Sequence, residues 1–497
     1  MEVLESLKPV HAICVSLLAA LLIAISGKKP NVREAWTVIA ALIKFGIVVS
    51  MLPAVLEGKV IEYSLLHVMP GLEIAFRVDA IAMFFALTAS TLWIITAFYC
   101  IGYMRYLNEK SQTRFYVCFA VSLSSALGIA FSANMFTLFV FYEILTLCTY
   151  PLVVHKQTSE AIKKARIYFA YLIGASLAFQ LPAIILTYYF TGTLDFVEGG
   201  IIAGTASNAV ITLIFVLYIA GIAKAGIMPL HLWLPSAMVA PTPVSALLHA
   251  VAVVKAGVYT IVKVVLYIFG VDLLKDLGLG FALACVASFT IIAASVIALQ
   301  KDNLKARLAY STVGQLSYIV LAVAILAPSA VAASLMHIMV HAVSKITLFF
   351  TAGAIYAVTY KTKVSELDGI GKQMPLTMIA FTIGAFSLIG IPLFAGFITK
   401  WYMIMGMLES EQLIFIVVIA ISSMLNAGYF LPIVYKAFFK PLPEGDDIKV
   451  KETSGYTAFM VFPLLVTAGG VIVMFFASPV MLGLAQLVIN AVFGGIR

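Results

Sequence analysis

Apolar stretches of about 20 residues recur along the whole chain and alternate with short polar segments. A helix of about 20 apolar residues crosses about 30 Å of hydrocarbon, so each stretch is a candidate membrane span. The pattern predicts fourteen spans, at residues 10–27, 36–56, 80–104, 115–132, 134–155, 167–190, 209–228, 244–268, 279–300, 308–327, 330–358, 375–396, 412–438 and 456–476. An apolar tail at 478–497 is expected to lie along or partly in the membrane. The sequence therefore predicts an all-α polytopic membrane protein.

Lysine and arginine residues are divided unevenly between the two sets of connecting loops. Nineteen of the 31 lie in loops that follow odd-numbered spans, and five lie on the other side, termini included. Because an excess of Lys and Arg marks the cytoplasmic side, we expect a cell-membrane protein with both termini on the outer side.

Composition supports the membrane assignment and excludes several classes of protein. The chain is 63% hydrophobic and 11% charged, whereas soluble domains have about 25% charged residues. The net charge of +8 does not indicate nucleic-acid binding, because the basic residues are dispersed over short loops. The five cysteines form no CxxC pair, so they are interpreted as packing residues rather than cluster ligands.

The seventh and twelfth predicted spans combine a lysine with residues that break a helix. These residues are Lys224, Pro229 and Pro235 within LYIAGIAKAGIMPLHLWLP, and Gly390, Pro392 and Lys400 within FSLIGIPLFAGFITKW. Proline leaves backbone carbonyls without their helical donors. At membrane depth such groups are tolerated only where they are buried in protein or line a wet cavity. We therefore expect both breaks to lie at an ion pathway.

The two breaks are five spans apart, which suggests two five-helix units related by an internal repeat. An odd number of spans inverts the second unit relative to the first. Inverted repeats with broken helices mark ion and substrate sites in transporters. The expected organisation is N-terminal helices at 1–112, a first repeat at 113–268, a second repeat at 276–438, and a final helix with its tail at 439–497.

Glu143 lies close to the middle of the fifth span, and an acid at that depth is a functional hypothesis by default. A glutamate held protonated between helices is the structural alternative. Lys224 is the expected partner, because two charges about 4 Å apart at an effective dielectric near 20 attract by about 4 kcal/mol. A pair that opens and closes would release and recapture a proton.

Titratable residues also gather in spans eight and eleven. Span eight supplies His249 and Lys255, and span eleven places His337, His341 and Lys345 on one helical face by their i, i+4 spacing. Histidine titrates nearest to neutral pH, so this face is interpreted as a proton relay. Structural hydrogen bonding and metal or haem ligation are the alternatives, although no second histidine pair offers opposing ligands. We expect neither a metal nor a cofactor.

Other polar residues in the predicted spans receive simpler interpretations. Lys263 and Lys436 lie near span ends and are expected to extend to the headgroups, while Lys44 has no evident partner. Span ten contains a polar stripe that could hold water, formed by Ser311, Thr312, Gln315 and Ser317.

Five motifs in order resemble the proton-translocating antiporter-like subunits of respiratory complex I, Mrp-type Na+/H+ antiporters and membrane-bound hydrogenase-type complexes. The resemblance covers roughly residues 75–440. It is carried by FYEILTLCTYPLV around Glu143, AKAGIMPLHLWLPSAMVAPTPVSALLHA (223–250), DNLKARLAYSTVGQLSY (302–318), HAVSKITLFFTAG (341–353) and GIPLFAGFITKW (390–401). VVKAGVY around Lys255 is similar to the D-type subunits of the Mrp antiporters, and Lys400 departs from a complex I branch with an acid there.

The resemblance implies fourteen helices, two inverted five-helix repeats and a hydrated polar axis. By matching motifs, it implies a charged chain of Glu143, Lys224, Lys255 and Lys400, with His249, His337, His341 and Lys345 as the connecting relay. The partners would be other membrane subunits, which supply redox chemistry or Na+/H+ exchange, and the transported ion would be H+. Na+ coupling would reside in neighbouring subunits, since Na+ sites usually need several oxygen ligands.

Two other functions remain open at this point. A self-sufficient secondary transporter for a small anion would cradle its substrate at the broken helices. An inert membrane anchor of a redox complex would need none of the buried charges. An integral-membrane enzyme is disfavoured, because the sequence contains no evident nucleophile, metal cluster or phosphate loop.

Overall fold

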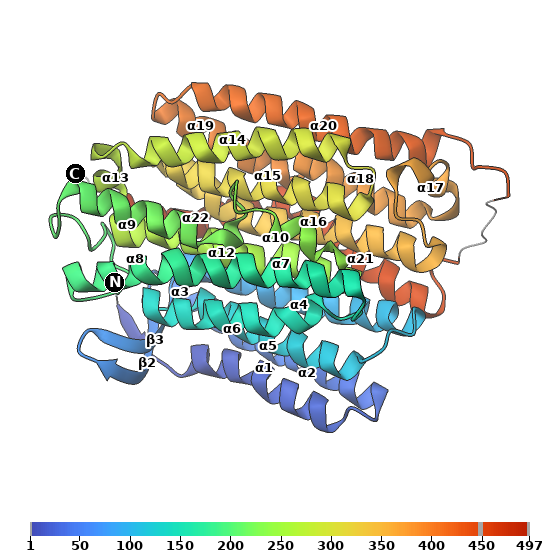
Figure 1. Ribbon diagram of the computed structural model, residues 1–497, viewed down its shortest axis with the longest axis horizontal. Coiled ribbons are helices and arrows are strands. Elements are labelled where there is room, and N and C mark those ends of the chain that lie inside the picture. Colours follow the sequence, from blue (N-terminus) through green and yellow to red (C-terminus); the bar gives the residue numbers. More distant parts are fainter. Residues whose placement is uncertain (1, 446–450, 495–497) are drawn as a thin grey trace.

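The computed structural model describes residues 2–445 and 451–494, and this part of the chain is mostly helical. The long helices lie side by side, with α1 and α2 at one edge of the molecule and α14 and α20 at the opposite edge (Figure 1). Ten helices among the described residues are long and apolar enough to cross a membrane. The chain is therefore an integral, multi-pass membrane protein.

The N-terminal part of the chain combines helices with a small sheet. Its elements are β1 (Val3–Glu5), α1 (Lys8–Ile25), α2 (Pro30–Val49), α3 (Leu52–Leu56), β2 (Val60–Met69), β3 (Leu72–Val78) and α4 (Ala80–Tyr106).

The next part contains continuous helices followed by a segment of short helical pieces. Its elements are α5 (Gln112–Ala130), α6 (Met135–Val153), α7 (Ser159–Ala175), the π-helical η1 (Ser176–Gln180), α8 (Leu181–Thr191), α9 (Asn208–Gly221), the 3₁₀ turn η2 (Ala223–Ala225), α10 (Trp233–Ser236), the 3₁₀ turn η3 (Ala237–Val239), α11 (Thr242–Ala246), the π-helical η4 (Leu247–Val251), α12 (Val253–Lys263) and the π-helical η5 (Val264–Phe269).

The C-terminal half is again dominated by long helices. Its elements are α13 (Val271–Asp276), α14 (Leu279–Gln300), α15 (Leu304–Ala324), α16 (Pro328–Thr359), the 3₁₀ turn η6 (Val364–Glu366), α17 (Ile370–Gln373), α18 (Pro375–Ile389), α19 (Ala395–Glu409), α20 (Ile414–Phe439), α21 (Gly455–Phe476) and α22 (Ser478–Phe493).

Polar residues start several of the long helices at the positions where the apolar pattern begins. The side chains of Asp79, Asn134 and Asn303 accept hydrogen bonds from backbone N–H groups in the first turns of α4, α6 and α15. Such N-caps satisfy donors that have no partner within the helix. The helix starts are thus fixed by local chemistry as well as by apolar packing.

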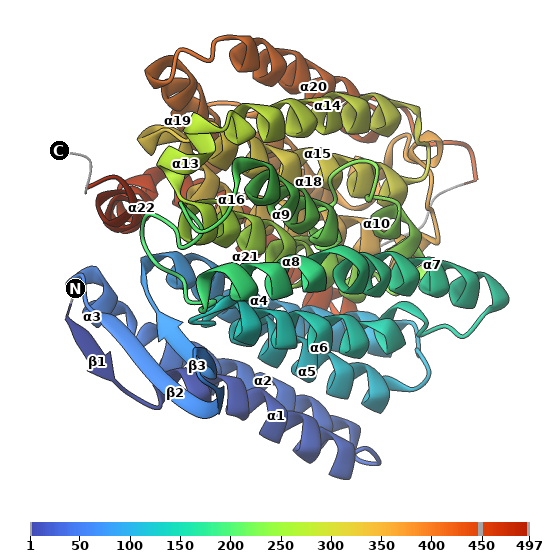
Figure 2. The same cartoon turned by 60° about the vertical axis from the view of Figure 1, so that its left-hand side comes forward.

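The sheet corrects the all-α expectation. β1 pairs with β2 in parallel, and β2 pairs with β3 in an antiparallel hairpin, which lies with β1 at one end of the helix bundle (Figure 2). Gly71, in the turn between β2 and β3, has φ +71°, and a Cβ there would lie 2.4 Å from the Gly192 carbonyl oxygen. The apolar runs do not indicate this sheet, because polar and apolar side chains alternate only partly over residues 60–69.

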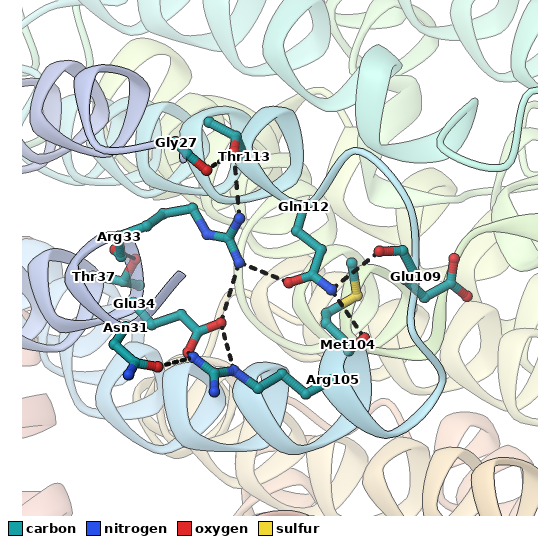
Figure 3. Close-up of polar contacts among 10 residues, drawn as sticks. All are labelled: Gly27, Asn31, Arg33, Glu34, Thr37, Met104, Arg105, Glu109, Gln112 and Thr113. Atoms are coloured by element: carbon teal, nitrogen blue, oxygen red, sulfur yellow. Dashed lines mark hydrogen bonds and ion pairs between the residues drawn. The ribbon is translucent and has the colours of Figure 1, made fainter. Parts of the chain in front are cut away.

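A buried ion-pair network holds the α1–α2 hairpin to the rest of the bundle. Glu34 of α2 accepts two hydrogen bonds from Arg105 of α4, with Nη2 at 2.6 Å and Nε at 3.1 Å (Figure 3). Arg33 donates to Glu34 at 3.2 Å and to Gln112 of α5 at 2.7 Å, and its guanidinium carbon lies 5.2 Å from the centre of the Tyr116 ring. The network therefore joins three helices at one end of the bundle.

The helix α16 occupies the centre of the fold. It packs against α4, α15, α18, α19, α21 and α22, and nearly all of its side chains between Ala330 and Ile355 are buried. The last described helix, α22, covers α16 and α4. Whether that helix lies in the membrane, as expected for the apolar tail, remains a prediction.

Candidate functional site

The helix α9 ends at Gly221, and the 3₁₀ turn η2, which contains Lys224, follows it. We call this end of regular helix the first interruption. Lys224 is fully buried, and its ammonium group donates to the Tyr142 carbonyl oxygen at 2.5 Å. The Ala223 carbonyl, released by the end of the helix, accepts from Trp233 Nε1 at 2.8 Å. The interruption is stabilised because neighbouring side chains satisfy the backbone groups that it frees.

Glu143 follows Tyr142 on α6 and lies close to the Lys224 environment. Its side chain is partly exposed at the surface of the isolated chain. Its Oε1 atom is buried and has no hydrogen-bond partner among the described residues, and no described ion pair within 4.0 Å includes Glu143. The expected Glu143–Lys224 pair is therefore one of neighbours rather than a closed ion pair.

Lys255, His341 and His337 form a continuous buried line between α12 and α16. Lys255 Nζ lies 2.7 Å from His341 Nδ1, although the two residues are 86 positions apart in the sequence. The His341 and His337 rings are one helical turn apart, with centres 6.1 Å from each other. His337 Nδ1 lies 2.8 Å from Thr399 Oγ1, and its Nε2 lies 3.1 Å from Gln315 Oε1. Each of these five side chains is at most 1% exposed.

A second interruption separates α18 from α19 and surrounds Lys400. The Lys400 ammonium donates to the Ile389 carbonyl oxygen and to Ser423 Oγ, both at 2.8 Å. Gly390 has φ +93°, and a Cβ there would lie 2.8 Å from Lys400 Cδ. The Leu388 carbonyl accepts from Asn426 Nδ2 at 3.3 Å. The end of α18 therefore provides acceptors for a buried ammonium group.

Two sets of contacts connect His337 with the surroundings of Lys400. Thr399, which meets His337, directly precedes Lys400 in α19. The Tyr318 ring lies 5.9 Å from the His337 ring and 5.2 Å from Lys400 Nζ. Lys255, both histidines and Lys400 thus share one polar region in the core.

Lys345 belongs to a side branch of this region. Its Nζ donates to Ser311 Oγ at 2.8 Å, and the Tyr429 hydroxyl donates to the same oxygen at 2.9 Å. Tyr429 also contacts Asn426 Oδ1 at 2.6 Å, and Asn426 reaches the end of α18. The face of α16 that carries Lys345 therefore connects with the Lys400 interruption from another side.

The structure does not join Lys224 and Lys255 by a hydrogen bond among the described residues, but their segments touch. A Cβ on Gly257 of α12 would lie 2.2 Å from the Lys224 carbonyl carbon and from the Ala225 nitrogen. η2 is therefore pressed onto α12 two residues beyond Lys255. The remaining predicted relay residue, His249, belongs to the π-helical η4, and its side chain lies outside the described residues.

Lys263 and Lys44 are both buried and have contacts that the sequence did not predict. Lys263 was expected at the headgroups, but it is 1% exposed and its Nζ lies 3.2 Å from Asp79 Oδ2. Lys44, for which no partner was evident, is fully buried, donates to the Leu123 carbonyl at 3.0 Å and lies 4.8 Å from the centre of the Trp93 ring. An ion pair with Asp79 explains why Lys263 stays inside.

Sequence reasoning missed several residues that contact the predicted ones. Tyr142, Thr399 and Ser423 accept from, or lie against, predicted site residues, and Asn426 lies among them. Asn426 could have been found from the sequence, because an asparagine within an apolar span indicates a buried polar contact. The Tyr142 carbonyl could not, because every residue has a backbone carbonyl. In the described part of the chain, no group of three or more His, Cys, Asp and Glu side chains is placed to hold a metal ion.

Comparison with protein families and relatives gives consistent matches. Residues 132–426 match the family described as NADH:quinone oxidoreductase/Mrp antiporter, TM. The chain is 32% identical over 390 residues to NADH-quinone oxidoreductase subunit N of Desulforudis audaxviator, covering 75% of this chain and 76% of that subunit. It is 31% identical over 354 residues to NAD(P)H-quinone oxidoreductase chain 5 of Synechocystis sp., of which the match covers 49%. The chain thus spans about half the length of the latter.

Solved structures share the fold over nearly the whole chain. A chain of the Mrp complex from Dietzia sp. superposes with a TM-score of 0.87 at 21% identity, covering 99% of this chain and 98% of that one. A chain of the archaeal membrane-bound sulfane sulfur reductase superposes with a TM-score of 0.84 at 25% identity, with 98% coverage of both.

Proposed function

Because the chain belongs to the family of membrane subunits of NADH:quinone oxidoreductases and Mrp antiporters, we propose that it translocates protons as one subunit of a larger ion-pumping complex. Its partners are other membrane subunits of that complex, in which redox chemistry or Na+/H+ exchange takes place. The relatives and the structural neighbours are themselves parts of multisubunit membrane complexes, which supports this assignment.

The observation that carries the proposal is the contact between Lys255 Nζ and His341 Nδ1 at 2.7 Å. An amine and an imidazole at this distance exchange the donor role when one proton moves between them. The second ring nitrogen of a histidine then offers a site for the next transfer. His341, His337 and Thr399 continue this line toward Lys400.

Lys224 and Glu143 form the switch at the other interruption. In the present arrangement the Lys224 ammonium is held by the Tyr142 carbonyl, and Glu143 is a neighbour without a direct ion pair. Movement of the Glu143 carboxylate toward Lys224 would stabilise the protonated lysine, and movement away would favour proton release. Glu143, Lys224, Lys255 and Lys400 are therefore the proposed titrating groups.

Ordered water completes this path. Buried oxygens of Glu143, Ser245, Tyr318 and Ser422 have no hydrogen-bond partner among the described residues. A buried polar group without a partner costs about 1–3 kcal/mol, and bound water removes that cost. These atoms lie on the helices that carry the proposed titrating groups or next to them.

The finer architecture belongs to the same proposal. Fourteen spans would form two inverted five-helix repeats at 113–268 and 276–438, preceded by helices at 1–112 and followed by 439–497. The interruptions at Lys224 and Lys400 occupy matching positions in the two units. Both termini would lie on the outer side, opposite the loops rich in Lys and Arg. The similarity of Lys255 and its neighbours to the D-type Mrp subunits would place the chain in that branch.

The proposal is tested with the assembled complex in vesicles that contain a pH-sensitive dye. We expect Lys255→Met and His341→Ala to reduce proton translocation on the order of 100-fold, a typical loss for a proton-transfer group. Matched controls are Lys436→Met, which removes a partly exposed lysine paired with Asp368 at 3.1 Å, and His67→Ala, which alters a largely exposed histidine. Both controls should retain wild-type rates.

The alternative functions give opposite results. An inert anchor would leave proton translocation unchanged in Lys255→Met and His341→Ala. A self-sufficient anion transporter would take up anions when the chain is reconstituted without its partners. The thermal midpoint of each variant complex, measured alongside, separates a lost proton path from a lost fold.

A further inference from the structure

A pocket lined by lysines lies beside the first turns of α7 and α15. In the ribbon view, α7 begins at the end of the bundle away from the sheet (Figure 1). The volume of the pocket is about 510 Å³. The cationic residues that line it are Lys156, Lys164, Lys305 and Lys361, and Glu160 is the acidic residue of its described lining. We call it the lysine pocket. It is separate from the buried line of Lys255, His341 and His337.

The first turns of two long helices add to the positive potential of the lysine pocket. Thr158 and Asn303 both line it, and they are the N-caps of α7 and α15. The N-terminus of a helix carries a partial positive charge of roughly half an elementary charge. Positively charged lysines and the partially positive N-termini of α7 and α15 thus line the same pocket.

Among its described lining residues, the lysine pocket holds more cationic than acidic side chains. Lys305 Nζ donates to the Ala240 carbonyl at 2.7 Å, and no described carboxylate forms an ion pair with Lys156, Lys164 or Lys305. Burial and then repulsion by Lys156 lower the pKa of Lys305 to about 7. Converging cations of this kind are stabilised when an anion binds between them.

We propose that the lysine pocket binds a phosphate group, supplied by the headgroup of an anionic phospholipid or by free inorganic phosphate. A phosphate offers several acceptor oxygens to donors that approach from different sides, as these lysines do. The loops that form the pocket belong to the Lys- and Arg-rich side of the chain, and such segments attract anionic headgroups. The apolar side chains of Met238 and Val239 also line the pocket and suit the glycerol portion of a lipid.

Binding is measured by lysine footprinting on the assembled, delipidated complex. A neutral amine reacts with an acylating reagent and an ammonium group does not, so a lysine with a pKa near 7 reacts readily at neutral pH. The probes are inorganic phosphate and short-chain phosphatidylglycerol, with chloride at matched ionic strength as the blank. We expect saturable protection of Lys305 of at least about fivefold, with no change at Lys436.

Two adjacent lysines of α7 provide matched variants. Lys164 lines the pocket, whereas Lys163 is exposed and does not. Lys164→Gln should weaken the apparent affinity about fivefold, since one lysine near an anionic surface contributes about that factor. Lys163→Gln removes the same charge from the same helix and should bind like the wild type.

The affinity should also depend on pH in a defined direction. The bound anion favours the protonated amine and raises the pKa of Lys305. Above pH 7 binding must therefore recruit a proton, and the affinity should fall by up to about tenfold for each pH unit. Below pH 7 the lysine is already charged and the affinity should level off. Phosphatidylglycerol suits this measurement because its phosphodiester keeps one charge throughout.

Each outcome supports or overturns the proposal. Protection by both probes identifies free phosphate as a sufficient ligand, and protection by the lipid alone identifies a headgroup site. Protection by neither probe overturns the proposal, as does an equal effect of Lys163→Gln and Lys164→Gln, which would indicate a diffuse charge effect. These binding measurements do not require proton translocation, so they stand apart from the test of the proposed function.

Discussion

Three buried lysines of the polar region around α16 are held by neutral groups. Lys255 meets an imidazole, Lys345 a serine hydroxyl, and Lys400 a carbonyl and a hydroxyl. A fixed carboxylate partner would hold each ammonium in its charged state. Neutral acceptors instead remain satisfied by either the ammonium or the amine, because both forms carry N–H donors. The residues are therefore suited to exchanging protons rather than to bracing the fold.

Lys400→Arg tests this distinction at a single position. Arginine keeps the positive charge and the donors but does not release its proton at any physiological pH. We expect proton translocation by the complex to fall on the order of 100-fold, with little change in its thermal midpoint. Lys436→Arg is the control, since Lys436 is a partly exposed lysine in an ion pair. Wild-type transport in Lys400→Arg would mean that only the charge of Lys400 matters.

At the scale of elements, buried lysines at the two helix interruptions donate to backbone carbonyl oxygens. The Tyr142 carbonyl holds Lys224 beside the first interruption, and the Ile389 carbonyl holds Lys400 at the second. Glycine allows backbone segments to pack closely at these places. At Gly396, a Cβ would lie closer to the Ser387 carbonyl oxygen than van der Waals contact permits. Small residues thus set the geometry of the lysines, although they carry no charge.

Apolar runs were enough to predict a mostly helical, multi-pass membrane protein, while the fourteen spans, the repeats and the broken helices stay predictions. The apolar runs were not enough to pair residues across the fold. The contact between Lys255 and His341 joins helices 86 residues apart, and Lys44 is satisfied by a backbone carbonyl, which every residue possesses. The β2–β3 hairpin was missed because its polar and apolar residues do not alternate strictly. Such features depend on tertiary packing rather than on local periodicity.

Gly257→Ala tests the packing of η2 against α12. The added Cβ would meet the Lys224 and Ala225 backbone at 2.2 Å, so the two segments must separate. We expect a loss of about 1–3 kcal/mol in stability and a lower transport rate, because Lys224 moves with its backbone. The control is Gly174→Ala on α7, where nothing lies within 4 Å of the added atom. There alanine should be neutral or slightly stabilising.

At the scale of the whole molecule, α16 connects the two halves of the core. It contacts α12 through His341 and α19 through His337. α12 packs against η2 at the first interruption, and α19 follows the second, so α16 lies between the two regions. The family resemblance drawn from five sequence motifs is confirmed by the match over residues 132–426. The roles of Glu143, Lys224, Lys255 and Lys400 remain predictions, because membership of a family does not assign the work of individual side chains.

The α1–α2 hairpin lies outside that matched region, and its attachment can be tested independently. Glu34 and Arg33 are both 4% exposed, and Glu34 bridges Arg33 and Arg105 (Figure 3). Removing one partner of a buried ion pair leaves an uncompensated charge and costs about 3–5 kcal/mol. We therefore expect Glu34→Ala to destabilise the N-terminal helices strongly, seen as a lower thermal midpoint and faster proteolysis of the loop between α1 and α2. Glu57→Ala, which breaks the exposed ion pair with Lys59, should change neither measurement. Equal behaviour of the two variants would show that the α1–α2 hairpin is held by apolar packing alone.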